Sequence, residues 1–324
     1  MSAARKCRLP ASVPGCPQVS QLPANVSAAR KCDPPNFARK VAARKKSARK
    51  LVARKVVARK CRDAKIEYVK DKQKFRFALT ALHNSPSLVS VTKTVTAECG
   101  TDLGEWKVCY GYTGVSHNSK AIFLAYRGTV SGIQLFYEAF RTIFATRDDA
   151  KIGGKVSAYF YNVYNYLRDA GLNGELTRLA NEFPDYQIYV TGHSLGGALA
   201  SIAAAEAIKV DGIAASRVKI ITFGEPRTGD TDYSAAFDSV LSYAYRVINQ
   251  HDIVPQVPPS WFMNYTHHKT EVWYANGMSD GATYKVCSED EDPTCEDSNT
   301  DLSVLNHIIY YNQLIVTYGA AGCA

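Results

Sequence analysis

The sequence predicts an α/β fold in which helices cover both faces of a mostly parallel central sheet. From residue 121 onward, short apolar runs alternate with longer amphipathic segments, as strands alternate with helices in such folds. A Gly-x-Ser-x-Gly sequence lies where an expected strand passes into an expected helix. Apolar residues make up 46% of the 324 residues and charged residues 21%, which excludes a disordered or fibrous chain. No apolar run is long enough to predict a membrane-spanning helix.

The expected elements follow from the period of the apolar residues. A continuous apolar run at 121–126 predicts a buried strand, and the segment 153–171, which ends at a glycine, predicts a helix. One face of that helix carries Val156, Tyr159, Phe160, Val163, Tyr166 and Leu167. The remaining expected elements alternate between the two types: helix 174–183, strand 187–191, helix 195–210, and strands 218–224 and 243–248.

The N-terminal part of the chain differs in charge from the rest. Residues 1–65 contain 18 Lys and Arg but two acids, a net charge of +16. Of the 39 bases and 30 acids in the chain, 21 and 28 are then left for residues 66–324, a net charge of −7. We therefore expect three regions, which are a flexible segment of low order at 1–36, a basic segment at 37–60 and a packed domain at 61–324.

The basic segment 37–60 repeats Ala-Arg-Lys every five residues. A step of five turns a helix by about 140°, so the charges spiral around it and no apolar stripe forms. The segment either binds an anionic membrane surface, at ~1 kcal/mol per basic side chain, or is only a solvated tail. Aromatic residues do not interleave with the charges, so no nucleic acid partner is expected.

Nine cysteines predict an oxidising compartment, because thiols stay free in a reducing cytosol. None has the Cys-x-x-Cys spacing of a zinc ribbon or a thioredoxin-type site. Two close pairs, Cys99 with Cys109 and Cys287 with Cys295, are typical of small loop-closing bridges. The first 35 residues contain no apolar segment of a secretory signal. We expect a secreted protein whose signal is missing from this chain, with an intracellular protein as the alternative.

The Gly-His-Ser-Leu-Gly sequence at 192–196 predicts a nucleophilic serine. A serine nucleophile stands at a sharp, strained turn between strand and helix, and glycines on both sides avoid clashes there. The helix that begins behind Ser194 also stabilises developing negative charge. His193 precedes the nucleophile and is expected to pack in the core.

A serine nucleophile needs a histidine base and a carboxylate that orients the base. In α/β folds of this kind the chain order is serine, acid, histidine. Asp252 follows the strand at 243–248, where α/β sheets keep their sites, and His307 begins an expected last helix. We therefore predict Asp252 as the acid and His307 as the base. His267 and His268 precede a strand-like segment and are expected to be structural.

The oxyanion of the reaction intermediate needs two hydrogen-bond donors. The N–H of Leu195 is one, and Thr129, in the loop after the first expected strand, offers an N–H and a hydroxyl. The segment that continues from this loop has apolar residues at helical spacing, which is consistent with either a lid over an apolar site or a core helix. These residues are Ile133, Phe136, Tyr137, Phe140 and Phe144.

Over residues 61–324 the chain resembles the class 3 (fungal-type) lipases, a branch of the α/β-hydrolases, and particularly their nematode members. The resemblance lies in Tyr-Arg-Gly-Thr at 126–129, Gly-His-Ser-Leu-Gly-Gly at 192–197, Phe-Gly-Glu-Pro-Arg at 223–227, Arg-Val-Ile-Asn-Gln-His-Asp-Ile-Val-Pro at 246–255 and Asn-His at 306–307. It implies a triad of Ser194, Asp252 and His307, oxyanion donors at Thr129 and Leu195, and a helical lid after Thr129.

The resemblance also implies three disulfides, which are Cys287–Cys295, Cys61–Cys323 and Cys99–Cys109. A serine, histidine and acid triad requires no metal and no organic cofactor, so none is expected. The acidic run at 288–297 lacks the spacing of an EF-hand, so we interpret it as a solvated disulfide loop.

The leading hypothesis is a serine-dependent carboxylic ester hydrolase, a triacylglycerol lipase that works through an acyl-enzyme at a lipid interface. One alternative is an esterase for short or aromatic acyl groups. Another is a non-catalytic protein that binds a lipid surface through its basic segment and its apolar lid segment.

Overall fold

The computed structural model describes residues 89–99, 108–128, 143–298 and 301–315. The expected boundaries between the three regions, at residues 36 and 60, lie outside this part of the chain and remain predictions. Several predicted site residues also lie outside it: Thr129, Ile133, Phe136, Tyr137, Phe140, Cys61 and Cys323.

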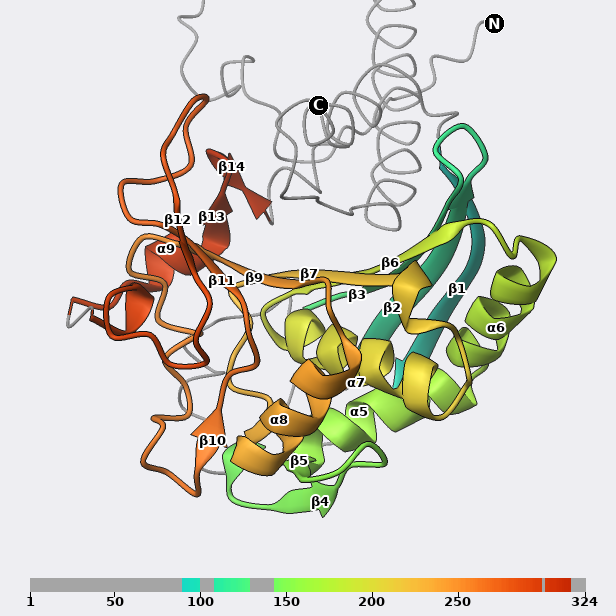
Figure 1. The fold of residues 1–324 in the computed structure, drawn as a ribbon, viewed down its shortest axis with the longest axis horizontal. Helices are drawn as coiled ribbons and strands as arrows, with labels where there is room; N and C mark the ends of the chain where they lie inside the picture. The colour runs from blue at the N-terminus through green and yellow to red at the C-terminus, as the bar shows by residue number, and fades with distance from the viewer. Residues whose placement is uncertain (1–88, 100–107, 129–142, 299–300, 316–324) are drawn as a thin grey trace, which may run out of the picture. The chain divides into compact units, whose positions relative to one another are not determined.

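An eight-stranded sheet forms the centre of the described residues (Figure 1). In spatial order its strands are β1 Ser90–Glu98, β2 Val108–Ser116, β3 Ala121–Tyr126, β6 Gln187–His193, β7 Val218–Phe223, β9 Ala244–Asn249, β11 Glu271–Tyr274 and β12 Lys285–Cys287. The five strands from β3 to β11 pair in parallel, and the pairs at the two edges are antiparallel. The prediction of a mostly parallel sheet is therefore confirmed, whereas the coverage of both faces by helices stays a prediction, because the four long helices that the structure describes lie on one face.

Four helices lie on one face of this sheet (Figure 1): α5 Ala158–Asp169, α6 Leu172–Glu182, α7 Leu195–Lys209 and α8 Thr231–Val240. In α7, 13 of the 15 residues are buried. A helix that is apolar on all sides belongs in the interior of a domain, which explains why α7 contains so many alanines and glycines. None of the described helices is long and apolar enough to cross a membrane.

Helix α5 begins later than the sequence predicts. The segment before it, β5 Lys155–Ser157, belongs to a small sheet of order β10, β8, β5, β4. Val156 fitted the spacing of the predicted helix, but it lies in β5 and pairs with Gly229 there. Its burial therefore results from the small sheet and not from a helix. The Ser157 hydroxyl accepts a hydrogen bond from the N–H of Phe160 at 3.4 Å and caps α5. Tyr166 is 46% exposed and does not share the buried face.

The remaining elements are short. The small sheet contains β4 Arg147–Asp149, β8 Gly229–Asp230 and β10 Tyr265–Thr266, and two 3₁₀ turns lie at η3 Ala215–Arg217 and η4 Glu296–Ser298. The expected last helix, α9 Val304–Ile308, has five residues, because the chain becomes extended at Ile309. It leads into the hairpin of β13 Ile309–Tyr310 and β14 Gln313–Leu314.

The register of the parallel strands brings their carboxyl ends together. His193, the last residue of β6, lies opposite Phe223 of β7, and Phe223 lies opposite Val247 of β9. The residues that follow these strands therefore meet at one edge of the sheet, where α/β folds form their sites.

Both close cysteine pairs form disulfides. Cys99 and Cys109 join β1 to β2 with their Cα atoms 5.8 Å apart, and the Cα atoms of Cys287 and Cys295 are 6.4 Å apart. Two disulfides are consistent with an oxidising compartment.

Candidate active site

Ser194 occupies the sharp turn between β6 and α7. Its φ is +59°, in the left-handed region that non-glycine residues seldom adopt, and only 5% of its surface is exposed. A Cβ atom on Gly192 would lie 2.0 Å from the carbonyl oxygen of Gly196. A Cβ atom on Gly196 would lie 2.3 Å from that of Tyr126. Glycine is therefore required on both sides of the serine, as the motif predicts.

The loop that leads to Thr129 approaches this turn. A Cβ atom on Gly128 would lie 3.3 Å from the Cβ atom of Ser194. Leu195 is the first residue of α7, and the N–H groups of a first helical turn have no partner within the helix. The N–H of Leu195, next to Ser194, is therefore available as a donor. Thr129 itself lies outside the described residues.

Asp252 and His307 form a pair without exposed surface. The Nδ1 atom of His307 lies 2.8 Å from Oδ1 and 2.9 Å from Oδ2 of Asp252. A carboxylate only accepts, so Nδ1 carries the proton and Nε2 is left as the acceptor of a neutral ring. Among the described residues Nε2 has no hydrogen-bond partner. This tautomer is the one a general base needs.

Tyr310 is a further partner of Asp252 that sequence reasoning missed. Its hydroxyl donates to Oδ2 of Asp252 at 2.6 Å, and the N–H of Val254 donates to Oδ1 at 2.9 Å. Burial and the charge of Asp252 raise the pKa of Tyr310, so the hydroxyl keeps its proton. The available signal was a tyrosine three residues after the predicted base.

The end of β7 connects Ser194 to this pair. The carbonyl oxygen of Phe223 accepts a hydrogen bond from the N–H of Ser194 at 2.9 Å. A Cβ atom on the next residue, Gly224, would lie 2.6 Å from Oδ2 of Asp252 and 2.8 Å from Nδ1 of His307. The structure thus gathers the three predicted residues around one strand end.

Three further histidines have different environments. His267 is buried, and burial lowers its pKa, so the ring is neutral and bonds the carbonyl oxygen of Pro255 at 2.8 Å. His268 lies 3.3 Å from the buried carboxylate of Glu225. The rings of His267 and His268 thus bond Pro255 and Glu225, and neither ring bonds Asp252. His193 was expected to pack in the core; it is only half-buried, and its ring lies 4.4 Å from that of the buried His307.

Phe144 is the one predicted lid residue that the structure describes. It has no exposed surface, and its ring makes edge contacts with Phe160 at 5.4 Å and Tyr265 at 5.6 Å. A lid residue that faces lipid cannot be fixed in the core in this way. For Phe144 the core alternative therefore holds, and a lid role for the residues before it stays a prediction.

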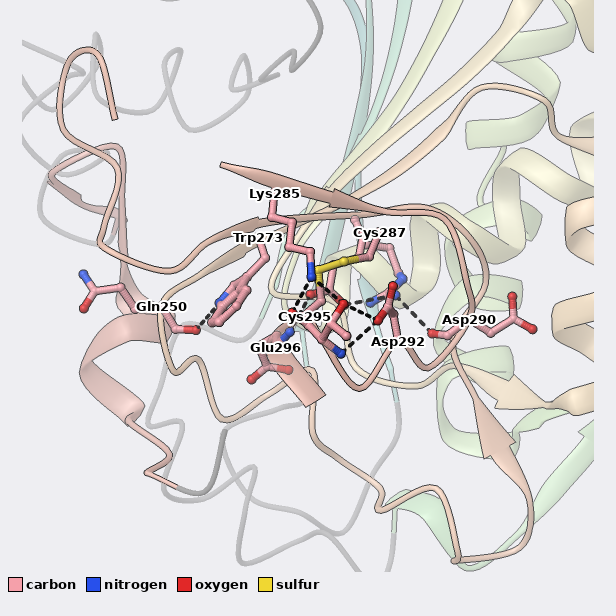
Figure 2. The surroundings of a disulfide bond; sticks show 11 residues. Gln250, Trp273, Lys285, Cys287, Asp290, Asp292, Cys295 and Glu296 are labelled. Atoms are coloured by element: carbon pink, nitrogen blue, oxygen red, sulfur yellow. Dashed lines mark hydrogen bonds and ion pairs between the residues drawn. A yellow bond between two sulfur atoms is a disulfide. The ribbon is translucent and has the colours of Figure 1, made fainter. Parts of the chain in front are cut away.

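Cys287 and Cys295 close a loop (Figure 2) whose residues are partly exposed and partly half-buried. Asp292 accepts hydrogen bonds from the N–H and the hydroxyl of Thr294 at the protein surface. Glu296 is buried instead, which corrects the interpretation of the whole acidic run as solvated. Figure 2 also shows the Trp273 indole donating to the carbonyl oxygen of Gln250, two residues before Asp252.

A buried arginine, Arg227, binds two other acids of the same run. Arg227 donates to Glu291 at 2.9 and 2.5 Å and to Asp297 at 2.9 Å, and we name these three residues the Arg227 cluster. Arg227 also donates to the carbonyl oxygens of Pro255 and Pro258. The cluster therefore ties the disulfide loop to the segment that follows Asp252. Among the described residues, no group of three or more His, Cys, Asp or Glu could hold a metal ion.

The Arg227 cluster is expected to make stability depend on pH through Asp297. Burial and the Glu291 carboxylate raise the pKa of Asp297 to about 7. An acid with a raised pKa in the folded state contributes stability below its unfolded pKa of about 4 and loses it as the pH rises through 7. Asparagine resembles the protonated acid. Asp297→Asn should therefore match the wild-type Tm near pH 4 and exceed it by on the order of 5 °C near pH 8.

Thermal unfolding of both proteins between about pH 4 and 8 measures this difference. Asp292→Asn is the matched control in the same acidic run. Hydrogen bonds from Thr294 lower the pKa of Asp292, so this group stays ionised over that range. A Tm difference between Asp297→Asn and the wild type that is constant with pH would contradict the prediction.

The sheet order, the turn at Ser194 and the buried acid–histidine pair together define the serine hydrolases of the α/β-hydrolase fold. Residues 123–262 match the model of the family described as lipase (class 3). The chain is 32% identical over 250 residues to Lipase ZK262.3 of Caenorhabditis elegans, an alignment that covers 66% of this chain and 68% of that protein. The chain belongs to the class 3 lipase family.

Solved structures of similar proteins are lipases as well. The lipase of Rhizopus microsporus var. chinensis has a TM-score of 0.64 and 26% identity, covering 78% of this chain and 80% of that one. A triacylglycerol lipase with a catalytic centre formed by a serine protease triad has a TM-score of 0.61 and 25% identity, covering 71% and 83%. The chain spans about half the length of a Rhizopus niveus lipase to which it is 32% identical.

Proposed function

We propose that the protein hydrolyses the ester bonds of triacylglycerols with Ser194 as nucleophile, His307 as base and Asp252 as the orienting acid. The observation that carries the proposal is the buried His307–Asp252 pair. Its Nε2 atom has no partner among the described residues, and Gly224 packs against both members next to the turn of Ser194. The triacylglycerol lipase with a serine protease triad supports the same assignment.

The proposed reaction proceeds in two halves. The Ser194 hydroxyl attacks the ester carbonyl while Nε2 of His307 takes its proton, and the Asp252 carboxylate stabilises the imidazolium. The N–H of Leu195, together with Thr129, donates to the oxyanion. The alcohol leaves with the proton from Nε2 and the acyl group stays on Ser194. Water then repeats these steps, which releases the fatty acid and restores the serine.

The substrate class is tested by fatty acid release from emulsified triacylglycerol, compared with hydrolysis of the p-nitrophenyl esters of acetic, benzoic and palmitic acid. We expect the protein to hydrolyse the emulsified triacylglycerol and the p-nitrophenyl ester of palmitic acid. Turnover of the acetate or benzoate ester alone would identify an esterase for short or aromatic acyl groups. No turnover of any substrate, with retained binding to lipid vesicles, would identify a binding protein and refute the proposal.

We also propose that the protein is secreted and that residues 37–60 hold it at an anionic lipid surface. The two disulfides support the first part, and the basic repeat supports the second. Each basic side chain near such a surface contributes ~1 kcal/mol, so binding should depend on lipid charge. Equal sedimentation of the full chain with anionic and with zwitterionic vesicles would refute the anchor.

A further inference from the structure

Helix α9 is too short to hold its own histidine in place. It has five residues, whereas isolated helices below about 12 residues are marginal in water. The last four carbonyl groups of a helix have no partner within the helix. The orientation of His307 must therefore come from contacts outside α9.

Side chains of two sheet strands bond the carbonyl groups around His307. The amide of Asn249 donates to the carbonyl oxygen of Asn306 at 3.2 Å and to that of Ile309 at 2.7 Å. The Nε2 atom of His193 lies 2.8 Å from the carbonyl oxygen of His307 itself. Carbonyl oxygens only accept, so Nδ2 of Asn249 and Nε2 of His193 are the donors. Both N–H bonds of the Asn249 amide are used.

The two donors are the last residues of the strands that precede the other members of the proposed triad. His193 is the last residue of β6 and directly precedes Ser194. Asn249 is the last residue of β9, and its carbonyl oxygen accepts from the N–H of Asp252 at 3.1 Å. Asn249 is 2% exposed, so water does not compete for its bonds. The sheet thus fixes α9 from both the nucleophile side and the acid side.

We propose that Asn249 and His193 form a carbonyl clamp that positions the imidazole of His307 between Asp252 and Ser194. Both are positioning residues, since their bonds go to the backbone of α9 and of Ile309, the residue that follows it. This inference rests on the proposed function for its catalytic consequence. Displacement of a catalytic group by about 1 Å can lower a rate by about 100-fold, so loss of the clamp should lower kcat by about that factor and leave KM nearly unchanged.

The test uses the full chain with Asn249→Leu and His193→Phe, which remove the donors and keep similar volumes. His193→Gln restores a donor at a similar reach and should recover most of the lost kcat. Asn173→Leu is the matched control, because Asn173 is also a buried asparagine but bonds Tyr164 on the helical layer. We measure kcat per active site titrated with a phosphonate, so that unfolded protein does not count.

A second readout does not depend on turnover. In proton NMR spectra, the Nδ1 proton of His307 bonded to Asp252 resonates far downfield of the other protons. The clamp predicts that this signal shifts or broadens in Asn249→Leu and His193→Phe and stays unchanged in Asn173→Leu. An unchanged signal in both clamp variants overturns the proposal, as does a kcat within about twofold of wild type.

The two proposals fail in different ways. If Ser194→Ala turns over esters as fast as the wild type, the proposed function is wrong, and the NMR signal alone decides the clamp. If Asn249→Leu does not fold, His193→Phe and its rescue by His193→Gln decide it. Equal losses of kcat in His193→Phe and His193→Gln would show that ring packing matters instead of the donor, and would remove His193 from the clamp.

Discussion

Replacing Ser194 by alanine is expected to lower kcat for ester hydrolysis by about four to six orders of magnitude. Alanine has no hydroxyl, so the acyl-enzyme cannot form and only the oxyanion donors and substrate binding remain. The substitution removes one oxygen from a turn whose backbone the neighbouring glycines make possible. KM should change little, because the hydroxyl contributes mainly to the transition state.

The measurement pairs hydrolysis of p-nitrophenyl palmitate with mass mapping of the residue that a p-nitrophenyl phosphonate modifies. Ser201→Ala is the matched control, since Ser201 lies in α7, the helix that follows Ser194, and bonds the Tyr233 hydroxyl at 2.8 Å. It should lower stability by roughly 1 kcal/mol and keep its turnover per labelled site. Equal rates for wild type and Ser194→Ala, or phosphonate on another residue, would reject Ser194 as the nucleophile.

Replacing Gly224 by alanine is expected to lower kcat by at least about 100-fold, although residue 224 takes no part in the proposed chemistry. Its φ is +54°, and an added methyl group would lie 2.6 Å from the Asp252 carboxylate and 2.8 Å from the His307 ring. These distances are shorter than van der Waals contact, so the acid, the histidine or the strand end must move. A displaced imidazole no longer aligns with the serine hydroxyl.

Gly212→Ala separates this clash from backbone strain. Gly212 has a φ of +71°, but no atom lies within 4 Å of the Cβ position. Both substitutions force alanine into the left-handed region, at a cost of about 1–2 kcal/mol. The two variants should therefore lose similar stability through strain, and Gly224→Ala alone should lose turnover. A Gly224→Ala variant with wild-type kcat would mean that the pair tolerates a shift of this size.

The features that the sequence predicted well are those that depend on local chemistry. The turn at Ser194 requires glycine at fixed positions, so five consecutive residues predict it. Asp252 was found because it follows the apolar strand that became β9. The pairs Cys99–Cys109 and Cys287–Cys295 were found because their members are only ten and eight positions apart. Each signal lies within a short stretch of chain.

The errors share another cause. Val156 matched the period of a helix but is buried by a strand of a different sheet. Phe144 has the spacing of a lid residue, yet Phe160 and Tyr265 enclose it. Glu296 stands in an acidic run that is typical of a solvated loop, and it is buried in the fold. In each case a residue distant in the chain, absent from the local pattern, decides the environment.

The amino-acid sequence by itself determined which residues form the site. A strained turn, a strand end and a short disulfide bridge each restrict the residue types that can form them, so a local pattern identifies these residues. Only the tertiary structure decided what holds these residues in place. Tyr310 and Asp252 are 58 positions apart, and His193 and His307 are 114 positions apart. No local preference connects such residues: their contacts form only when the parallel strands align their carboxyl ends at one edge of the sheet.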